Sequence, residues 1–346
     1  MDIDKSDSIL RNNFSRIGEK YKDIYDCLEH NSILITGATG IIGTTIVKII
    51  LEKTQTTKVV ALIRNKEKAE AIFKNYAHQA QRLVFVCADV TQPIEIKSDI
   101  DYIVHAANET SSKAFVDTPV ETIATALNGT KNVLELAKKQ KIKGLVYLSS
   151  MEVYGSPETD NKIFENHGTN LLTTEVRTSY PESKRMCESL CVSYASEYKV
   201  PAKIIRLTQT FGPGISYNDK RVFADFARCA IEKRPIILHT KGETKRNYLY
   251  TVDAATAILT VLIKGAIGEA YNAANESTYC SIYEMAQLVA RQCTNNAIQV
   301  KIKEEDPAKY GYAPPLKMNL DTTKLQMLGW SASTNLAEMF EALIRT

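Results

Sequence analysis

The feature that most constrains this chain is a glycine-rich turn near its N-terminus. The residues ILITGATGIIG (33–43) run from a short apolar segment through three glycines into a helical pattern. Gly37 permits a tight turn, Gly40 lets the backbone approach a diphosphate, and Gly43 lets the helix close on the strand. The N-terminus of that helix then faces the phosphates. The turn therefore predicts a strand, turn and helix that bind a dinucleotide.

Beyond this turn, short apolar runs alternate with helical patterns up to about residue 212. The apolar runs are rich in β-branched residues and nearly unbroken, as in KVVALIR (58–64), GLVYLSS (144–150) and AKIIRLTQTFG (202–212). Runs of this kind are typical of parallel strands that helices cover on both faces. We expect an α/β fold, a Rossmann-like doubly wound parallel sheet with a smaller C-terminal α/β substrate lobe.

The same pattern divides the chain into three regions. Residues 1–30 carry apolar side chains three and four positions apart, which predicts an N-terminal helical extension packed on the main body. Residues 31–206 are expected to form the NAD(P)-binding domain, with a returning segment at about 236–263. Residues 207–235 and 264–346 contain more turns, and we expect them to form the substrate-binding lobe.

Composition excludes several classes of function. The net charge of +3 is small and the basic residues are dispersed, so nucleic acid is not an expected partner. The seven cysteines lack metal-ligand spacing, so we expect no metal site. No stretch reaches the ~18 to 20 apolar residues that span a membrane, and the N-terminus lacks an apolar leader. We therefore expect no membrane association and a cytoplasmic location.

The end of the second strand bears on the choice of cofactor. An acidic residue there would hydrogen-bond the ribose 2′-hydroxyl of NAD, but the strand ends in Arg64 and Asn65. An arginine suits the additional phosphate of NADP through its charge and its fork of donors. The cofactor is therefore NADP or NAD, and Arg64 favours NADP.

Three residues form a candidate catalytic group. Tyr180 and Lys184 are four residues apart, which places them on one face of a helix. A nearby ammonium lowers the pKa of a phenol, so we expect Lys184 to make Tyr180 a usable acid and base. Ser150 ends a parallel strand, where ligands gather in open sheets, and its hydroxyl can bond the oxygen on which Tyr180 acts.

A set of motifs in a fixed order extends the pattern over residues 32 to about 330. The motifs are TGATGIIG, Asp89 with Val90, His105 with Ala106 and Ala107, LSSMEVYG (148–155), YPESK (180–184), RLTQTFGPG (206–214) and RNYLYTVDAA (246–255). In this set the chain resembles the extended short-chain dehydrogenase/reductase family, specifically its NAD(P)-dependent nucleotide-sugar epimerases and dehydratases.

This resemblance implies roles for individual residues. The expected catalytic residues are Ser150, Glu152, Tyr180 and Lys184. The expected cofactor-binding residues are Gly37, Thr39, Gly40, Ile41, Ile42, Gly43, Arg64, Asp89, Val90, Ala106, Ala107, Asn108, Ser149, Tyr180 and Lys184. The expected substrate-binding residues are Ser150, Met151, Glu152, Gln209, Arg221 and Arg246, with Arg246 at the diphosphate and Arg221 beside the nucleotide.

Two departures from the family pattern bear on the reaction. The 4,6-dehydratases carry Asp and Glu directly after the catalytic hydroxyl residue, whereas this chain has Met151 and Glu152. Elimination of water is disfavoured without the acid, while Glu152 remains as in the decarboxylases. Gln209 stands where the family commonly has Asn, which suggests an altered contact with the sugar.

The expected partner is a nucleotide-activated sugar, and the resemblance also implies a homodimer. The simplest activity is a 4-epimerase acting through a transient keto sugar. The alternatives are an NADPH-dependent reductase of a nucleotide-linked keto sugar or ketose, for example CDP-linked, and then a decarboxylase or a 4,6-dehydratase. A non-catalytic NADP-sensing protein is a more distant alternative, because both Tyr180 and Lys184 are retained.

Overall fold

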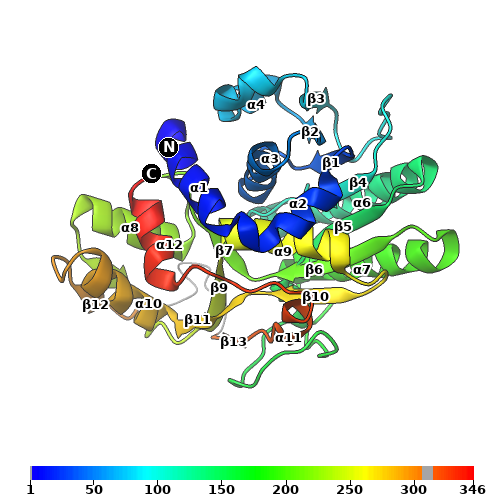
Figure 1. Cartoon of the computed structure of the whole chain (residues 1–346). Helices are drawn as coiled ribbons and strands as arrows, with labels where there is room; N and C mark the ends of the chain where they lie inside the picture. Colours follow the sequence, from blue (N-terminus) through cyan, green and yellow to red (C-terminus); the bar gives the residue numbers. More distant parts are fainter. Residues whose placement is uncertain (1, 306–314) are drawn as a thin grey trace.

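The central element of the fold is a parallel sheet. A computed structural model of the chain describes residues 2–305 and 315–346. Its seven-stranded sheet has neighbouring strands parallel throughout (Figure 1). The order across it is β10 (Ala270–Ala273), β6 (Ala202–Leu207), β5 (Gly144–Ser150), β4 (Tyr102–His105), β1 (Ser32–Thr36), β2 (Lys58–Ile63) and β3 (Leu83–Cys87). The strand order reverses between β1 and β4, which is where doubly wound sheets bind ligands.

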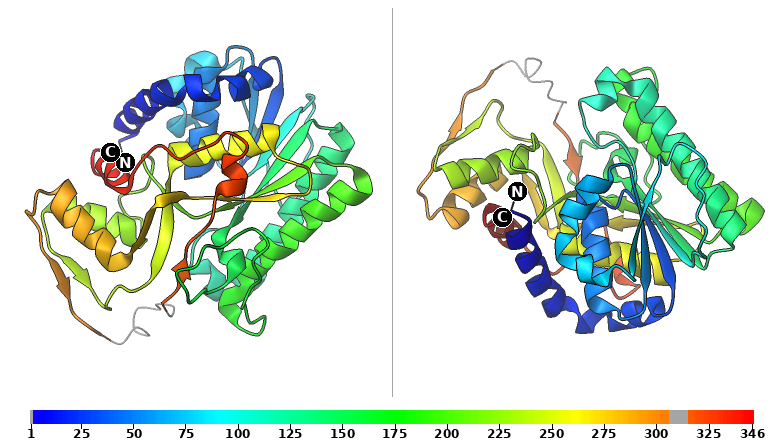
Figure 2. Two further views of the ribbon diagram at one scale, coloured as in Figure 1. Left: turned by 60° about the horizontal axis from the view of Figure 1, so that its bottom comes forward. Right: turned by 90° about the horizontal axis from the view of Figure 1, so that it is seen from above.

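Helices cover both faces of this sheet, as the strand composition predicts. One face carries α3 (Ile41–Lys53) and α9 (Thr251–Lys264), which pack on each other and on the strands (Figure 2). The other face carries α6 (Pro119–Gln140) and α7 (Ser179–Tyr198), which lie side by side. The shorter helices α4 (Lys66–Ile72) and α5 (Ala114–Asp117) follow β2 and β4 in the chain. The predicted fold class is therefore confirmed.

The N-terminal extension forms a third helical layer. It consists of α1 (Ile3–Ile17), one turn of 3-10 helix (Glu19–Tyr21) and α2 (Lys22–Leu28), and it packs on α3 and α9. Leu10, Phe14 and Ile17 are buried beneath α1, following the apolar spacing. The Asp7 carboxylate is buried too, and it pairs with Lys48 of α3. The two ends of the chain meet, because Asp2 N–H donates to the Thr346 carbonyl at 3.4 Å (Figure 2).

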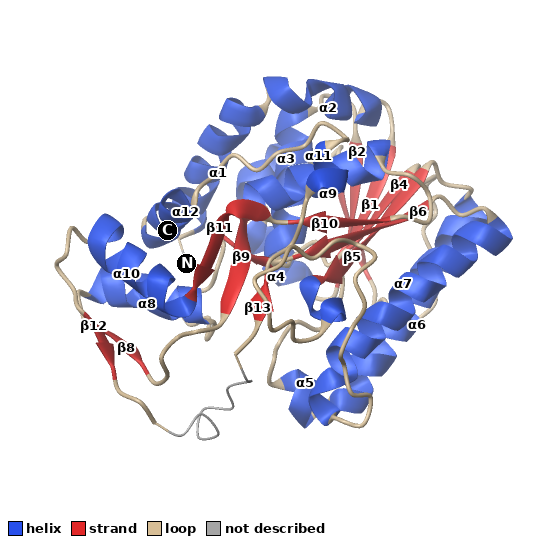
Figure 3. Cartoon of the chain, turned by 90° about the horizontal axis from the view of Figure 1, so that it is seen from below, coloured by secondary structure: helices blue, strands red, loops and turns tan. Residues whose placement is uncertain are grey.

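A smaller body lies beyond the carboxyl ends of the central strands (Figure 3). Its four-stranded sheet contains β7 (Gln209–Phe211), β9 (Lys245–Tyr250), β11 (Asn275–Ser281) and β13 (Lys317–Met318), and a separate pair contains β8 (Ile236–Leu238) and β12 (Val300–Ile302). Its helices are α8 (Val222–Glu232), α10 (Ile282–Leu288) and α12 (Leu336–Ile344), while α11 (Thr323–Gln326) packs on β10 at the edge of the central sheet. Phe211 anchors the packing, with ring centres of Phe223 at 4.5 Å and Phe340 at 5.1 Å.

The structure differs from the expected domain boundaries in two places. Strand β10 lies within 264–346, the expected lobe, but it pairs with β6 at the edge of the central sheet. Strand β8 lies within the expected returning segment, 236–263, but it pairs with β12. Both strands are only three or four residues long, and a pattern this short does not identify the sheet that a strand joins. Residues 306–314 of the expected lobe lie outside the described residues.

Candidate active site

The glycine turn has the geometry that the sequence predicts. Gly37 has φ of +67°, and a Cβ atom there would lie 2.8 Å from the backbone of Ala106 and Ala107. A Cβ on Gly43 would overlap the Gly37 carbonyl. Helix α3 begins directly after Gly40, which adds no side-chain cap to its free N–H groups. The turn therefore presents bare backbone N–H donors at a helix N-terminus, which fits the diphosphate of a dinucleotide.

The other expected cofactor residues follow the carboxyl ends of neighbouring strands. Thr39, Ile41 and Ile42 border the turn after β1, Arg64 follows β2, Asp89 and Val90 follow β3, and Ala106, Ala107 and Asn108 follow β4. The exposed Asp89 carboxylate accepts hydrogen bonds from the Thr91 N–H at 2.9 Å and hydroxyl at 2.8 Å. Arg64 is exposed. Because adjacent parallel strands end at one edge, these residues surround the glycine turn.

A buried polar network fixes the strand ends beside this turn. Ala107 N–H donates to the Thr36 hydroxyl at 3.1 Å, and Thr36 contacts His105 Nδ1 at 2.8 Å. His105 Nε2 lies 3.2 Å from the Thr130 hydroxyl, which contacts the Cys187 thiol at 3.2 Å. Burial and, to a smaller extent, the positive charge of Lys184 lower the pKa of His105 to about 3. The network therefore holds a neutral imidazole and connects β1, β4, α6 and α7.

The three expected catalytic residues come together at the end of β5. Tyr180 and Lys184 are buried in the first turns of α7, and Ser150 ends β5. Lys184 Nζ donates to the Leu148 carbonyl at 2.6 Å and lies 5.8 Å from the centre of the Tyr180 ring. The Ser150 hydroxyl hydrogen-bonds the Tyr180 side chain. This arrangement suits acid and base chemistry on one substrate oxygen.

The electrostatics of Tyr180 differ from the expectation. Burial raises the pKa of Tyr180 well above its usual value, and the Glu152 charge raises it further. The opposing effects come from the Ser150 hydrogen bond and the Arg177 charge, and Lys184 does not contribute. Burial lowers the pKa of Lys184 itself to about 8. The expected lowering of the Tyr180 pKa by Lys184 is therefore not seen, because burial of the phenol dominates and the ammonium donates to the Leu148 carbonyl.

Sequence reasoning missed two residues beside Tyr180. The Phe115 ring stacks on the Tyr180 ring, with centres 4.2 Å apart and planes within 8°. The Arg177 guanidinium lies 4.9 Å from the centre of the Phe115 ring, and its Nη2 donates to Glu152 Oε2 at 2.9 Å. Arg177 precedes Tyr180 by three residues in the sequence. This spacing points to a shared site only once the surroundings of Tyr180 are known. Phe115 comes from α5 and carries no such signal.

A second missed pair supports the strand end. The Arg206 side chain donates to both Glu188 oxygens, at 2.9 and 2.7 Å, and to the Tyr154 hydroxyl at 2.8 Å. Ser149, an expected cofactor residue, donates its hydroxyl to Glu188 Oε1 at 2.5 Å. Glu188 lies one turn after Lys184 on α7. The Ser149 side chain therefore contacts α7, and the network ties β5, β6 and α7 together directly beneath Ser150.

Four of the expected substrate-binding residues lie in three different parts of the structure. Arg246 Nη1 donates to Gln209 Oε1 at 3.4 Å, while Arg246 Nε is buried without a partner among the described residues. Arg221 precedes α8 and pairs with Asp219 at 2.7 Å. Met151 is buried, and it packs in a cluster with Val153, Tyr154, Ile163, Ala274, Met318 and Leu320. The structure thus places Gln209 and Arg246 together, Arg221 in a separate ion pair, and the Met151 side chain in the core.

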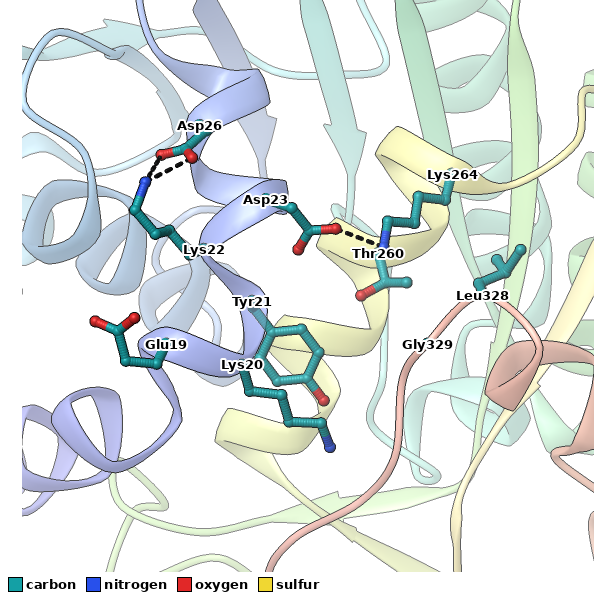
Figure 4. A pocket seen from close by; sticks show the side chains of 10 residues that line it. All are labelled: Glu19, Lys20, Tyr21, Lys22, Asp23, Asp26, Thr260, Lys264, Leu328 and Gly329. Atoms are coloured by element: carbon teal, nitrogen blue, oxygen red, sulfur yellow. Dashed lines mark hydrogen bonds and ion pairs between the residues drawn. The ribbon is translucent and has the colours of Figure 1, made fainter.

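A polar groove of about 560 Å³ lies elsewhere, between the N-terminal helices and α9 (Figure 4). The Asp23 and Lys264 side chains form an ion pair across it at 2.6 Å. None of the expected site residues lines this groove. In the part of the chain that the structure describes, no helix is long and apolar enough to cross a membrane.

Comparison with known proteins identifies the family. A model described as the NAD dependent epimerase/dehydratase family matches residues 33–274. The chain belongs to this family. It is therefore related to NAD-dependent enzymes that act on nucleotide sugars, and the resemblance inferred from the motifs is confirmed.

Individual members of the epimerase/dehydratase family extend the match. UDP-glucuronic acid decarboxylase 3 of Arabidopsis thaliana is 29% identical over 313 residues, which cover 90% of this chain and 87% of that protein. The epimerase Mth375 of Methanothermobacter thermautotrophicus has a TM-score of 0.77 at 22% identity, covering 96% of this chain and 95% of that one. A UDP-glucuronic acid 4-epimerase of Bacillus cereus has a TM-score of 0.76 at 20% identity, covering 90% and 98%.

Proposed function

We propose that this protein is an NAD-dependent decarboxylase of a UDP-linked uronic acid that first oxidises C4 of the sugar. The observation that carries the proposal is the single carboxylate, Glu152, next to Ser150 and Tyr180, with an apolar Met151 packed away in the core. A 4,6-dehydratase would have an acid at position 151. The similarity to UDP-glucuronic acid decarboxylase 3 over 90% of this chain supports the same class of substrate.

The residues of the site supply the proton transfers that this reaction requires. Tyr180 takes the proton of the C4 hydroxyl as the phenolate, and Ser150 hydrogen-bonds the same oxygen. Because burial raises the pKa of Tyr180, this step requires the positive charge of bound NAD to favour the phenolate. The glycine turn, with Gly37, Gly40 and Gly43, would hold NAD, which would supply the hydride acceptor and donor for C4 without being consumed. The C4 ketone lies β to the C6 carboxylate, so the C5–C6 electron pair moves toward the C4 oxygen as CO2 leaves. Tyr180 and Ser150 then stabilise the enolate oxygen, and C5 takes up a proton from water. Tyr180 finally returns its proton to the C4 oxygen as the hydride is restored to C4.

Isotope labelling tests the proposal. Purified protein with NAD is incubated with UDP-glucuronic acid carrying 13C at C6, and products are followed by NMR. We expect labelled CO2 in equal amounts with a UDP-pentose and no net NADH. Tyr180→Phe should abolish turnover because the proton acceptor is lost. Absence of any reaction with UDP-uronic acids in the wild-type protein would overturn the proposal.

A second candidate is 4-epimerisation of the same substrate, and one observation favours it. Glu152 forms an ion pair with Arg177, so its carboxylate is engaged rather than free to exchange protons. Tyr180, Ser150 and Lys184 would play the same parts, with hydride returned to the opposite face of C4. In the labelling experiment this activity would retain all of the 13C and invert C4. A reductase would instead oxidise added NADPH steadily in the presence of a nucleotide-linked keto sugar.

The finer choice of cofactor rests on Arg64. Its position after β2 supports NADP, whereas the redox-neutral reaction proposed here requires no exchange of cofactor and suits NAD. Affinities for both cofactors, measured by calorimetry in wild-type protein and Arg64→Ala, decide between them. A preference for NADP that disappears in Arg64→Ala supports the role of Arg64. Equal loss of affinity for both cofactors would contradict it.

We also propose a homodimer formed through α6 and α7. Exposed apolar side chains on these helices support it, namely Val120 and Ile123 on α6 with Met186 and Val192 on α7. Contiguous exposed apolar patches mark interaction surfaces in soluble proteins. Sedimentation of the wild-type protein should give a dimer, and Met186→Glu with Val120→Glu should give a monomer. We propose that the seven-stranded sheet with its helices is the NAD(P)-binding domain, on which the N-terminal extension packs, and that the smaller body is the substrate-binding lobe.

A further inference from the structure

Arg177 occupies a position that suits recognition of a substrate carboxylate. It lies in the 3-10 turn Val176–Thr178 immediately before α7, and its guanidinium contacts the Phe115 ring, which stacks on Tyr180. The Arg177 and Glu152 side chains remain 41% and 32% exposed, so their ion pair is partly accessible to solvent. A charged ligand that approaches from solvent can therefore reach this ion pair.

The existing partner of Arg177 is itself a carboxylate. Arg177 Nη2 donates to Glu152 Oε2 at 2.9 Å. A guanidinium carries five N–H donors in a rigid fork, and its preferred partners are carboxylates and phosphates. A second carboxylate can therefore share this guanidinium or replace Glu152 on it.

The chemistry of the substrate indicates which cation meets which anion. In a nucleotide-linked uronic acid the diphosphate is attached to C1, whereas the carboxylate is attached to C5, next to the reacting C4. Arg246 and Arg221 belong to the smaller body and lie on β9 and before α8. Lys184 is buried and donates to the Leu148 carbonyl. Arg177, in contrast, is partly exposed, and its guanidinium can donate to both oxygens of a carboxylate.

We infer that Arg177 is the specificity-determining residue for the sugar carboxylate, and that Glu152 occupies its guanidinium until that carboxylate arrives. The inference rests on the proposed function, because it assumes a uronic acid substrate. Substrate binding then releases Glu152 from its ion pair at the moment when the reacting carbon reaches Tyr180. A neutral sugar, which has no carboxylate, would leave Glu152 bound to Arg177.

Binding measurements with the NAD-loaded protein test this inference without depending on turnover. Every protein compared, the otherwise wild-type reference included, carries Tyr180→Phe so that UDP-glucuronic acid is not converted, and affinities for UDP-glucuronic acid and UDP-glucose are measured by calorimetry. In Arg177→Gln we expect UDP-glucuronic acid to bind about 10- to 100-fold more weakly, since a charge-assisted bidentate contact is lost, while UDP-glucose binds within about twofold of wild type. Arg177→Lys should fall between, because it keeps the charge but loses the fork.

The competing carboxylate provides a second and opposite expectation. Glu152→Gln removes the anion that occupies Arg177, so UDP-glucuronic acid should bind about two- to tenfold more tightly. The double variant Glu152→Gln/Arg177→Gln should behave like Arg177→Gln. A purely structural ion pair would instead weaken binding of both sugars in either single variant. Lys113→Gln is the matched control, because it removes one exposed charge from the turn before α5.

The outcomes separate this inference from the proposed function. If wild-type protein binds UDP-glucuronic acid and UDP-glucose equally, the uronic acid assignment fails and this inference fails with it. If wild type prefers UDP-glucuronic acid and Arg177→Gln keeps that preference, only the role of Arg177 is overturned. The same holds if Glu152→Gln weakens binding of UDP-glucuronic acid.

Discussion

The ion pair of Arg206 with Glu188 and the ion pair of Lys48 with Asp7 are both shielded from water, yet they are built differently. The Arg206 guanidinium on β6 donates to both Glu188 oxygens on α7 and also to the Tyr154 hydroxyl. The side chains of Lys48 and Asp7 are only 4% and 2% exposed, and they join α3 to the N-terminal extension. Asp7 has Asn75 as a second partner, at 2.9 Å.

The difference in contacts between the two ion pairs predicts which properties of the protein each pair affects. Burying a charge is costly unless its hydrogen bonds are satisfied, so a bidentate pair tolerates burial better than a point charge. The first pair supports Ser149, one residue before the expected catalytic serine. The second pair contacts α1, which contains none of the expected site residues. We therefore expect the first to affect stability and turnover and the second to affect stability alone.

The largest effect is expected from Arg206→Met. This change leaves Glu188 buried without its partner, which costs about 3 to 5 kcal/mol in the free energy of unfolding. Turnover should also fall, because the end of β5 loses its support. Urea unfolding and steady-state kinetics measure the two effects. As a control, Arg206→Met/Glu188→Leu removes both charges and should recover most of the stability.

A smaller effect is expected from Lys48→Met. Asp7 is then buried and unpaired, but Asn75 remains beside it and α1 can loosen locally, so the cost is about 1 to 3 kcal/mol. Hydrogen exchange should increase within Ile3–Ile17, while kcat and KM stay at wild-type values. A fall in kcat as large as that of Arg206→Met would show that the two pairs do not divide their roles.

His105 shows a third way to bury a titratable group, as a neutral ring. Its native pKa is about 3 against about 6.5 when unfolded, so only the unfolded state takes up a proton as pH falls between these values. This lowers stability by up to about 1.4 kcal/mol per pH unit below pH 6.5. Unfolding measured from pH 7 to 4 should show a shallower fall in His105→Asn than in wild type. Parallel curves for the two proteins would mean that His105 is protonated in the native state.

The smallest effect is expected from Lys22→Ala. The ion pair of Lys22 with Asp26 is exposed on both sides, and water and salt screen it. The unfolding midpoint should not change measurably, in low or in high salt. A clear drop would indicate that exposed pairs matter in the N-terminal extension as much as the buried one.

Much of the fold could be predicted because its signals are local. Gly37 and Gly43 leave no room for a Cβ, and the apolar runs are long enough to identify parallel strands. The segments that form β8 and β10 fall in the wrong regions of the predicted division, because strands of three or four residues do not identify their partner strand. Tyr180, Lys184 and Ser150 were found from residue type and spacing, and the structure brings them together.

The sequence by itself determined the turn, the strand rhythm and the identity of the tyrosine, lysine and serine, since each depends on residues close together in the chain. Only the tertiary structure decided the charge environment of Tyr180. Burial, Glu152, Arg177 and the stacked Phe115 come from separate elements, and electrostatic effects depend on distance in space and on exclusion of water. For the same reason the partner of Arg177 became visible only in the folded chain.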